Sequence, residues 1–402
     1  MKVIVIGAGA SGLIAAAYAK KNGHDVTILE KKQKAGIKLS ITGKGRCNVT
    51  NNCSIESLLN NTVTNSNFLY SSFNNFDSND TIDLFKNLGV NLKTERGNRV
   101  FPESDKAIDI VNALLKFNSS NKIVYNCTVK KLLIEQNKIT GVILDNNEQI
   151  LCDAVVVCTG GKSYPNTGST GDGYNFAKQA GHSITKLSPS LVPIICKETW
   201  CKDLMGLSLK NVCVSFYQHD KQIYSEQGEM LFTHFGVSGP LILSGSAHIN
   251  DVNNCKISID LKPALTHNQL HDRLLKDFAK YSNKDFCNAL NQLLPQKLIN
   301  VFIKLTEINP HIKVNQITKE MRNKIVALLK NIELNIKSFR PIEEAIITRG
   351  GVNIKEVNPK TMQSKFCEGL YFAGEILDVD AYTGGYNLQI AFSTGFAAGN
   401  NL

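Results

Sequence analysis

The chain has 402 residues, of which 43% are hydrophobic and 20% are charged, which indicates a globular enzyme of two or three domains. No stretch approaches the ~20 uninterrupted apolar residues of a membrane-spanning helix, so we expect no membrane span. The net charge of +10 suits either a basic surface for phosphate-bearing ligands or a biased Asn- and Lys-rich composition. The scattered lysines favour the second and argue against nucleic-acid binding.

The first thirty residues predict a unit that binds an adenine dinucleotide. An apolar strand over residues 3–6 is followed by the glycine turn GAGASG at 7–12 and a helix over 13–22. A second strand, Asp25–Leu29, ends at the acid Glu30. This order of strand, glycine turn, helix, strand and acid is far more specific than an isolated GxGxxG motif.

Each residue of this pattern has a physical role. Gly7 permits the tight turn, Gly9 lets the backbone approach a pyrophosphate, and Gly12 lets the helix pack closely on the strand. The N-terminus of the helix offers N–H groups and a positive dipole end to phosphates. Glu30 is placed to accept a hydrogen bond from a ribose hydroxyl.

Strands and helices alternate up to about residue 190 and change in character afterwards. The expected helices are 76–88, 107–117 and 174–180, and the expected strands are 122–133, 138–144 and 149–158. Short strand-like runs follow over 194–262 and helices over 267–335. From Ile342 the chain returns to strand, glycine turn and helix, with a last helix to Gly399.

We therefore predict an α/β protein in which both ends of the chain build one Rossmann-type domain, with a mostly parallel sheet and a right-handed crossover. Residues 1–191 form its first part and residues 337–402 its second part. Residues 192–336 form an inserted domain, β-rich over 192–265 and helical over 266–336.

Three strand-like runs end in glycine, at Gly7, at Gly160-Gly161 and at Gly374. Ligands of a doubly wound sheet lie outside the carboxyl ends of its strands, and glycine there allows close backbone approach. One such end can be an ordinary turn. Three of them indicate one long ligand across the sheet edge, which favours FAD over a mononucleotide.

Two further segments are candidates for cofactor contact. Residues 383–387, before a helix of small residues, would aim a helix N-terminus at the flavin pyrimidine; the alternative is an ordinary helix capped by Asn387. The loop 43–51 would follow the phosphate–ribityl chain, with Arg46 as a phosphate or carbonyl partner; the alternative is a solvated basic loop. The glycine-rich loop 163–173 would cover the dimethylbenzene side of a flavin or simply reverse the chain.

These segments resemble the aminoacetone-oxidase-like family of bacterial NAD(P)/FAD-dependent oxidoreductases. The matching stretches are GAGASGL at 7–13, ITGKGRCNVTN at 41–51, GNRVFPESDKA at 97–107, CTGGKSYPNTGSTGDGY at 158–174, SPSLVPI at 188–194, GEMLFTHFGVSGP at 228–240, TRGGV at 348–352 and the segment 370–399. Ile37 and Lys44 depart from the family pattern, which has Arg and Gly there, so we expect phosphate contacts near this loop to differ from those of the family.

The resemblance implies a glutathione-reductase-like FAD-binding domain with a β-rich and helical insert. The cofactor-binding residues that it and the glycine turn imply are Gly7, Gly9, Ala10, Ser11, Gly12, Glu30, Lys31, Gly43, Arg46, Cys47, Asn48, Val129, Thr159, Gly160, Gly374, Glu375, Gly385, Asn387 and Leu388. No second GxGxxG lies in the interior, so NAD(P)H would dock only transiently over the flavin.

The resemblance implies oxidoreductase chemistry without fixing a substrate. We expect a hydride to pass between flavin N5 and a small amine, an unsaturated ring compound or NAD(P)H. His234 is the candidate acid/base group, with a structural histidine as the alternative; Cys47 is a less favoured redox partner, and Arg99 and Arg349 are less favoured partners for anionic groups. An RNA-modifying flavoprotein and a non-catalytic flavin-binding regulator are the alternative functions, and the oligomeric state stays open.

The 11 cysteines form no CxxC pair. In a chain of this size, such scattered cysteines favour reduced thiols and a cytoplasmic location. They also argue against a zinc or iron–sulfur site, and we find no Ser–His–Asp or metal-ligand pattern. The N-terminal apolar run has no separate basic leader, so we expect no signal peptide.

Overall fold

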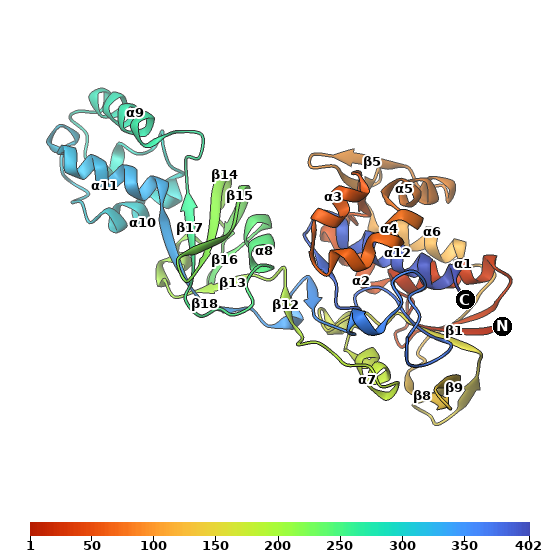
Figure 1. Cartoon of the computed structure of the whole chain (residues 1–402). Coiled ribbons are helices and arrows are strands. Elements are labelled where there is room, and N and C mark those ends of the chain that lie inside the picture. Colours follow the sequence, from red (N-terminus) through yellow and green to blue (C-terminus); the bar gives the residue numbers. More distant parts are fainter. The chain divides into compact units, whose positions relative to one another are not determined.

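The chain leaves its first structural unit and returns to it. The computed structural model describes residues 1–402 and divides into Met1–Ser190 with Pro341–Leu402, and Leu191–Arg340 (Figure 1). Both termini belong to the first unit. This is the predicted fold class, an α/β Rossmann-type domain interrupted by a β-rich and helical insert. The insert runs to Arg340 rather than to residue 336.

The centre of the first unit is a five-stranded sheet in the order β20-β11-β1-β2-β7. Its strands are β1 (Lys2–Ile6), β2 (Asp25–Leu29), β7 (Lys122–Val124), β11 (Ala154–Val157) and β20 (Leu370–Phe372). All neighbouring pairs are parallel. Strand β11 is buried along its whole length. A strand covered on both faces has an unbroken apolar sequence of this kind.

Helices α1 (Ala10–Lys21) and α12 (Tyr386–Asn400) pack side by side against this sheet (Figure 1). Glycine makes their contact possible. A Cβ at Gly395 would lie 2.5 Å from the carbonyl oxygen of Ser11, and one at Gly399 would lie 2.2 Å from that of Ala15. The small residues at the C-terminus therefore bring the last helix onto the first one.

Smaller elements surround this core. The helices are α2 (Ile37–Ile41), α3 (Ile55–Asn60), α4 (Tyr70–Asn75), α5 (Ser78–Asn87), α6 (Ala107–Phe117) and α7 (Asp172–Gln179). The strands are β3 (Thr50–Asn51), β4 (Thr62–Thr64), β5 (Leu92–Glu95), β6 (Arg99–Pro102), β8 (Val129–Glu135), β9 (Lys138–Leu144), β10 (Gln149–Leu151), β12 (Ser188–Ser190), β19 (Ile347–Arg349) and β21 (Asp380–Ala381).

Two of the expected strands are divided. The run 122–133 forms β7 of the parallel sheet and β8 of an antiparallel one, with Asn126 between them at a φ of 52°. The run 149–158 likewise forms β10 and β11, which belong to different sheets. Apolar periodicity within a run does not show where the chain changes sheets, so both were expected as single strands.

The second unit contains a closed antiparallel barrel in the order β13-β16-β15-β14-β17-β18. Its strands are β13 (Ile194–Cys196), β14 (Ser208–Gln218), β15 (Lys221–Phe232), β16 (Gly236–Ser238), β17 (Cys255–Asp260) and β18 (Ile332–Phe339). Strand β18 pairs with β13 and β17, which is why the insert extends past residue 336 and why its last stretch is not helical.

The helices of the second unit are α8 (Pro240–Ser246), α9 (His267–Lys280), α10 (Gln296–Thr306) and α11 (Lys319–Lys330). In α9 the buried residues Leu270, Leu274 and Phe278 recur every fourth position, which gives the helix one apolar face. A capping box between Thr266 and Gln269 fixes where it begins.

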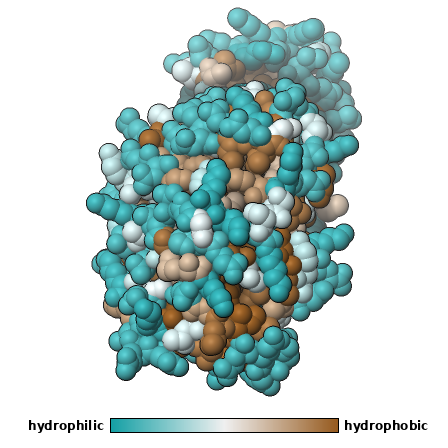
Figure 2. Space-filling view, turned by 90° about the vertical axis from the view of Figure 1, so that its right-hand side faces the viewer, coloured by the Kyte–Doolittle hydropathy of each residue, from teal (hydrophilic) through white to brown (hydrophobic).

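Hydrophilic side chains cover most of the face shown in Figure 2, and apolar residues are visible between them as patches. No helix of the structure combines the length and the apolar character that crossing a membrane requires.

Candidate functional site

A cleft opens at the carboxyl ends of three adjacent parallel strands, β1, β11 and β20. Its volume is about 1320 Å³ when the solvent space at its open side is counted. Twelve of the predicted cofactor-binding residues line it: Gly7, Gly9, Ala10, Ser11, Glu30, Lys31, Val129, Thr159, Gly160, Glu375, Asn387 and Leu388. The three glycine-marked strand ends inferred from the sequence thus lie side by side.

The three glycines of the first turn are glycines for different reasons. Gly7 has a φ of +102°, and a Cβ there would lie 2.6 Å from the carbonyl oxygen of Cys158. A Cβ at Gly12 would lie 2.0 Å from the carbonyl oxygen of Gly7. Gly9, in contrast, has no atom of a more distant residue within 4 Å of the Cβ position. The fold itself requires Gly7 and Gly12, whereas the space above Gly9 is open.

Gly9 is also the N-cap residue of α1, and no side chain caps that helix. Glu30 lies beside the turn: its Oε2 accepts a hydrogen bond from the backbone N–H of Ala8 at 2.8 Å, and its Oε1 accepts from Lys32 at 2.8 Å. Lys31 Nζ lies 2.7 Å from Asp172 Oδ2. The end of the cleft beside β1 and β2 therefore has an uncapped helix N-terminus and a carboxylate held by backbone N–H groups.

A cluster around Glu375 forms the wall at the end of β20. Lys38 Nζ donates to Glu375 Oε2 at 2.5 Å and to Ser163 Oγ at 2.7 Å. Glu375 Oε1 accepts from Ser163 Oγ at 2.8 Å and from the backbone N–H of Thr348 at 2.9 Å. Sequence reasoning missed Lys38, because a single lysine beside the unusual Ile37 carries no motif of its own. Ser163 and Thr348 lie in segments that the sequence analysis singled out, but it gave neither residue a role of its own.

The start of α12 excludes the alternative of a helix capped by Asn387, and it places Gly385, an expected cofactor contact, outside the cleft. Its N-cap is Gly385, with a φ of +102° and no side-chain cap, so Asn387 does not cap the helix. Asn387 instead accepts from the N–H of Ala381 at 3.0 Å and donates to the carbonyl oxygen of Ala381 at 2.8 Å. A Cβ at Gly385 would lie 2.3 Å from backbone atoms of Thr50, and Gly385 does not line the cleft. Packing against β3 and the left-handed backbone both require glycine there.

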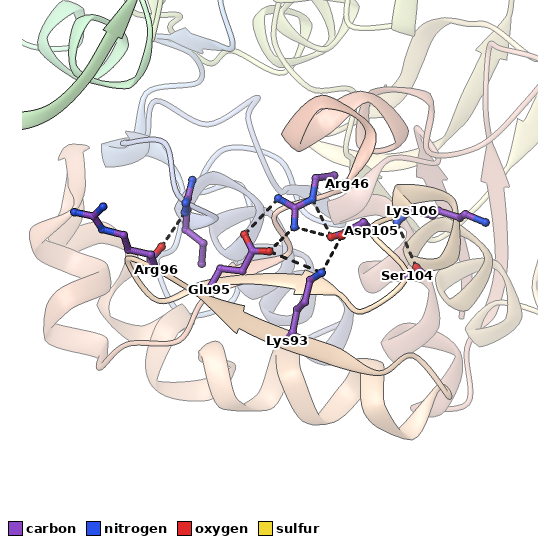
Figure 3. A network of polar contacts seen from close by, with 8 residues as sticks. Arg46, Lys93, Glu95, Arg96, Ser104, Asp105 and Lys106 are labelled. Atoms are coloured by element: carbon purple, nitrogen blue, oxygen red, sulfur yellow. Dashed lines mark hydrogen bonds and ion pairs between the residues drawn. The ribbon is translucent and has the colours of Figure 1, made fainter. Parts of the chain in front are cut away.

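Arg46 is engaged away from the cleft (Figure 3). Its Nη2 lies 2.5 Å from Glu95 Oε1 and 2.6 Å from Asp105 Oδ1, and its guanidinium stacks 4.2 Å from the centre of the Phe101 ring. Hydrogen bonds from Lys93 and then Arg46 lower the pKa of Asp105, and hydrogen bonds to Glu95 and Asp105 raise the pKa of Arg46. The expectation that Arg46 contacts the cofactor therefore conflicts with this ion-pair network.

Three other predicted cofactor contacts of the loop 43–51, Gly43, Cys47 and Asn48, also lie outside the lining of the cleft. The same is true of Gly12 and Gly374. Cys47 is fully buried, and burial raises the pKa of its thiol to about 12. Because the thiolate is the reactive form, such a thiol is unsuited to a redox partnership with a flavin.

His234 belongs to the second unit, on the turn between β15 and β16, where it is exposed and its ring lies 4.9 Å from that of Phe235. Its acid/base role stays a prediction. Arg349 Nε lies 3.8 Å from Asp380 Oδ2, and Arg99 donates to the carbonyl oxygen of Arg96. Neither lines the cleft.

A buried histidine of the first unit also escaped the sequence analysis. His182 Nε2 lies 2.6 Å from Ser364 Oγ, and its Nδ1 lies 3.3 Å from Glu356 Oε2. The order of groups is that of a hydrolase triad, but Ser364 Oγ already accepts from the N–H groups of Phe366 and Cys367. With its oxygen occupied in this way and its side chain buried, Ser364 holds a turn together instead of acting as a nucleophile.

The profile of the HI0933-like protein Rossmann domain matches residues 1–401. The chain belongs to this HI0933-like family. Two curated relatives are similar over nearly their whole length. The 3-dehydro-bile acid delta(4,6)-reductase of Clostridium scindens is 29% identical over 99% of this chain and 98% of its own. The ribosomal RNA dihydrouridine synthase of Haemophilus influenzae is 32% identical over 98% of this chain and 96% of its own.

Solved structures share the fold of this HI0933-like protein. A flavocytochrome c3 fumarate reductase aligns with a TM-score of 0.54 and 16% identity, over all of this chain and 77% of the other. The 3-ketosteroid-delta4-(5alpha)-dehydrogenase of Rhodococcus jostii RHA1 aligns with a TM-score of 0.53 and 14% identity, over 99% and 96% of the two chains. At these identities the likeness concerns the fold.

Proposed function

We propose that this protein binds FAD non-covalently and reduces a carbon–carbon double bond of an unsaturated ring compound. The open space at Gly9 carries the first part of the proposal. Apart from Gly9 and its two chain neighbours, no protein atom lies within 4 Å of the Cβ position there, although Gly7 and Gly12 on either side are tightly packed. A pyrophosphate can approach the backbone at that point and accept hydrogen bonds from the uncapped N-terminus of α1.

The donor set along the cleft suits the other parts of FAD. Glu30 and Val129 would hold the adenosine, and each Glu30 oxygen keeps a lone pair beyond the one that accepts a backbone N–H. Thr159 and Gly160 at the end of β11 would follow the middle of the cofactor. Glu375 and Leu388 would adjoin the ribityl and flavin end. FMN lacks the adenosine that Glu30 and Val129 would bind, so this end of the cleft favours FAD.

Bound FAD supplies hydride transfer at its N5 atom. The chain's own contribution is to bind, orient and exclude water. Ile37, Ile347 and Leu388 line the cleft with apolar groups. Lys38 Nζ donates hydrogen bonds to Glu375 Oε2 and Ser163 Oγ, so its positive charge offsets the negative charge of Glu375 in the wall of the cleft.

The choice of a double bond rests on the two curated relatives, which are similar to this chain over at least 96% of their own lengths. Both names describe addition of hydrogen to a carbon–carbon double bond conjugated with a carbonyl group, in one case in a 3-dehydro-bile acid and in the other in a uracil ring. Reduction of such a bond is the chemistry that they share, and NAD(P)H is the hydride donor that we propose. An amine substrate, as in aminoacetone oxidases, is the competing choice.

Anaerobic stopped-flow of the holoprotein separates these choices. NADH or NADPH should bleach the flavin band, and a cyclic enone, such as a 3-keto-4-ene steroid, should restore it. A small amine should leave the oxidised band unchanged. Bleaching by amines with no reoxidation by enones would replace the proposal with amine oxidation. Reduced protein that no acceptor reoxidises would support a non-catalytic regulator.

A ribosomal RNA uridine is the second candidate substrate. The net charge of +10 favours it, together with a polar cleft of the barrel that contains Lys197, Lys256 and Lys337. Lys256 is paired with Asp220 at 2.9 Å. Lys197 and Lys337 are therefore the residues to change.

RNA affinity measured as a function of salt tests this candidate. If RNA is the substrate, affinity should fall by more than ~10-fold between low and moderate salt. The Lys197→Ala/Lys337→Ala double variant should bind RNA more weakly and show a shallower salt slope, with enone reduction unchanged. A weak salt dependence would remove RNA from consideration.

A further inference from the structure

We propose that Asp285, Cys287 and His311, in the helical part of the second unit, bind one Zn²⁺ ion. A carboxylate oxygen, a thiol sulfur and an imidazole nitrogen from these residues all lie within 4.8 Å of one another. Asp285 and Cys287 are half-buried and His311 is exposed, so the cluster can be reached from solvent. This site is independent of the cleft in the first unit and of the proposed reduction.

The backbone holds the two contributing segments in register. The N–H of Phe286 donates to the carbonyl oxygen of Ile312 at 2.9 Å, and that of Cys287 donates to Pro310 at 3.0 Å. The N–H of Val314 donates back to Lys284 at 3.0 Å. The side chain of Phe286 is fully buried and anchors its segment in the core. The three side chains are therefore brought together by paired backbone and not by a chance crossing of surface loops.

The distance between the carboxylate and imidazole ligand atoms fits a tetrahedral ion. Asp285 Oδ2 lies 3.7 Å from His311 Nδ1, which is too long for a hydrogen bond. Two ligands on a tetrahedral Zn²⁺ with bonds of about 2.0–2.3 Å lie about 3.3–3.7 Å apart. A water molecule would complete the coordination. The sulfur and nitrogen donors favour Zn²⁺ over Mg²⁺ and Ca²⁺, which prefer shells made of oxygen.

Lys313 pairs with the same carboxylate, with its Nζ 2.8 Å from Asp285 Oδ1. This contact leaves Asp285 Oδ2, the oxygen that faces His311, for the metal. Hydrogen bonding of the second oxygen of a ligating carboxylate is a common feature of zinc sites, where it fixes the orientation of the ligand. The side chain of Lys313 is 52% exposed, so solvent screens its charge from an incoming ion.

A bound ion would tie together two connections that are distant in sequence, one between α9 and α10 and the other between α10 and α11. The thiol would lose its proton on binding. The expected consequence is a second unit that is more resistant to unfolding when zinc is present, since an ion that binds the folded state stabilises it.

Equilibrium dialysis of the full-length, reduced protein against Zn²⁺, followed by metal analysis and zinc-edge X-ray absorption, tests the proposal. Wild type should retain one equivalent of zinc, with one sulfur and the remaining ligands nitrogen or oxygen. Cys287→Ser, His311→Ala and Asp285→Asn should each weaken zinc binding by more than about tenfold. Cys213→Ser, which changes another half-buried cysteine, should bind zinc as wild type does.

Two results would overturn the proposal. One is wild-type protein that retains no zinc, or a zinc shell without sulfur. The other is zinc binding by Cys287→Ser equal to that of wild type, which would assign the metal to other thiols. X-ray absorption of the wild type decides the matter even if a variant folds poorly.

Discussion

The ammonium of Lys38 and the carboxylate of Glu375 lie 2.5 Å apart in the wall of the cleft, although 337 positions separate them in the chain. Only 24% of the Lys38 side chain and 11% of the Glu375 side chain are exposed to solvent. A pair this sheltered leaves an uncompensated charge in the cleft when one partner is removed.

Lys38→Met should therefore lower the free energy of unfolding by about 1.5–3 kcal/mol, the range for hydrogen bonds to charged groups. It should also weaken FAD binding and lower the flavin potential, because the unpaired Glu375 carboxylate repels an anionic cofactor. Urea unfolding and a potentiometric titration measure the two effects. Lys38→Arg should restore most of both, and Lys34→Met, a change of another cleft lysine, should have little effect. Equal effects at Lys34 and Lys38 would show that overall charge matters and the pair does not.

Gly385→Val should destabilise the protein by more than about 2 kcal/mol, because its Cβ would lie 2.3 Å from backbone atoms of Thr50. Any loss of FAD would then follow from displacement of α12. Gly181→Val is the matched control: it shares a positive φ, +85°, but has no atom within 4 Å of its Cβ position. It should lose only about 1–2 kcal/mol to left-handed strain. Equal losses at the two sites in thermal unfolding would contradict the packing argument.

Acidification should destabilise the fold through His182. Burial lowers the pKa of His182 below its usual value of 6.5, in spite of the nearby Glu356. Just below pH 6.5 the unfolded chain therefore binds a proton that the folded protein does not, and the free energy of unfolding falls as the pH falls. The contribution of His182 to the free energy of unfolding is fully present above the pKa that this histidine has in the unfolded chain, and it is lost as the pH falls toward the pKa of the folded state.

Urea titrations of wild type and His182→Gln from about pH 7.5 to about pH 5.5 isolate this effect, since the other histidines contribute to both proteins. Wild type should lose more stability than the variant over that range. Parallel pH profiles would mean that His182 does not titrate differently in the two states.

The sequence predicted the fold class because the parallel strands β1, β11 and β20 are short apolar runs that end in glycine. It also placed α6 and β9 at their observed bounds, since strong periodicity and polar turns mark both. It failed where tertiary pairing decides. Strand β18 follows a helical region directly, and only its pairing with β13 and β17 makes it part of the barrel.

The candidate site was predictable at its glycine turn and less so elsewhere. Gly9 and Glu30 follow a motif with a known geometry, whereas Arg46 reads as a free phosphate partner until Glu95 and Asp105 are found beside it. Gly385 reads as a cofactor glycine until its contact with Thr50 is seen. The zinc ligands proposed above come from two separate segments, so no local spacing such as CxxC announces them.

The most direct test of the central claim is the cofactor content of wild type and of Gly9→Val, measured side by side after acid precipitation and chromatography. Gly9 has a φ of −87° and open space at its Cβ position, so valine should fold there without strain. Its side chain would fill the space assigned to the pyrophosphate. We predict FAD from wild type, and a stable, colourless Gly9→Val protein. FMN alone from wild type, or full FAD occupancy in Gly9→Val, would contradict the account.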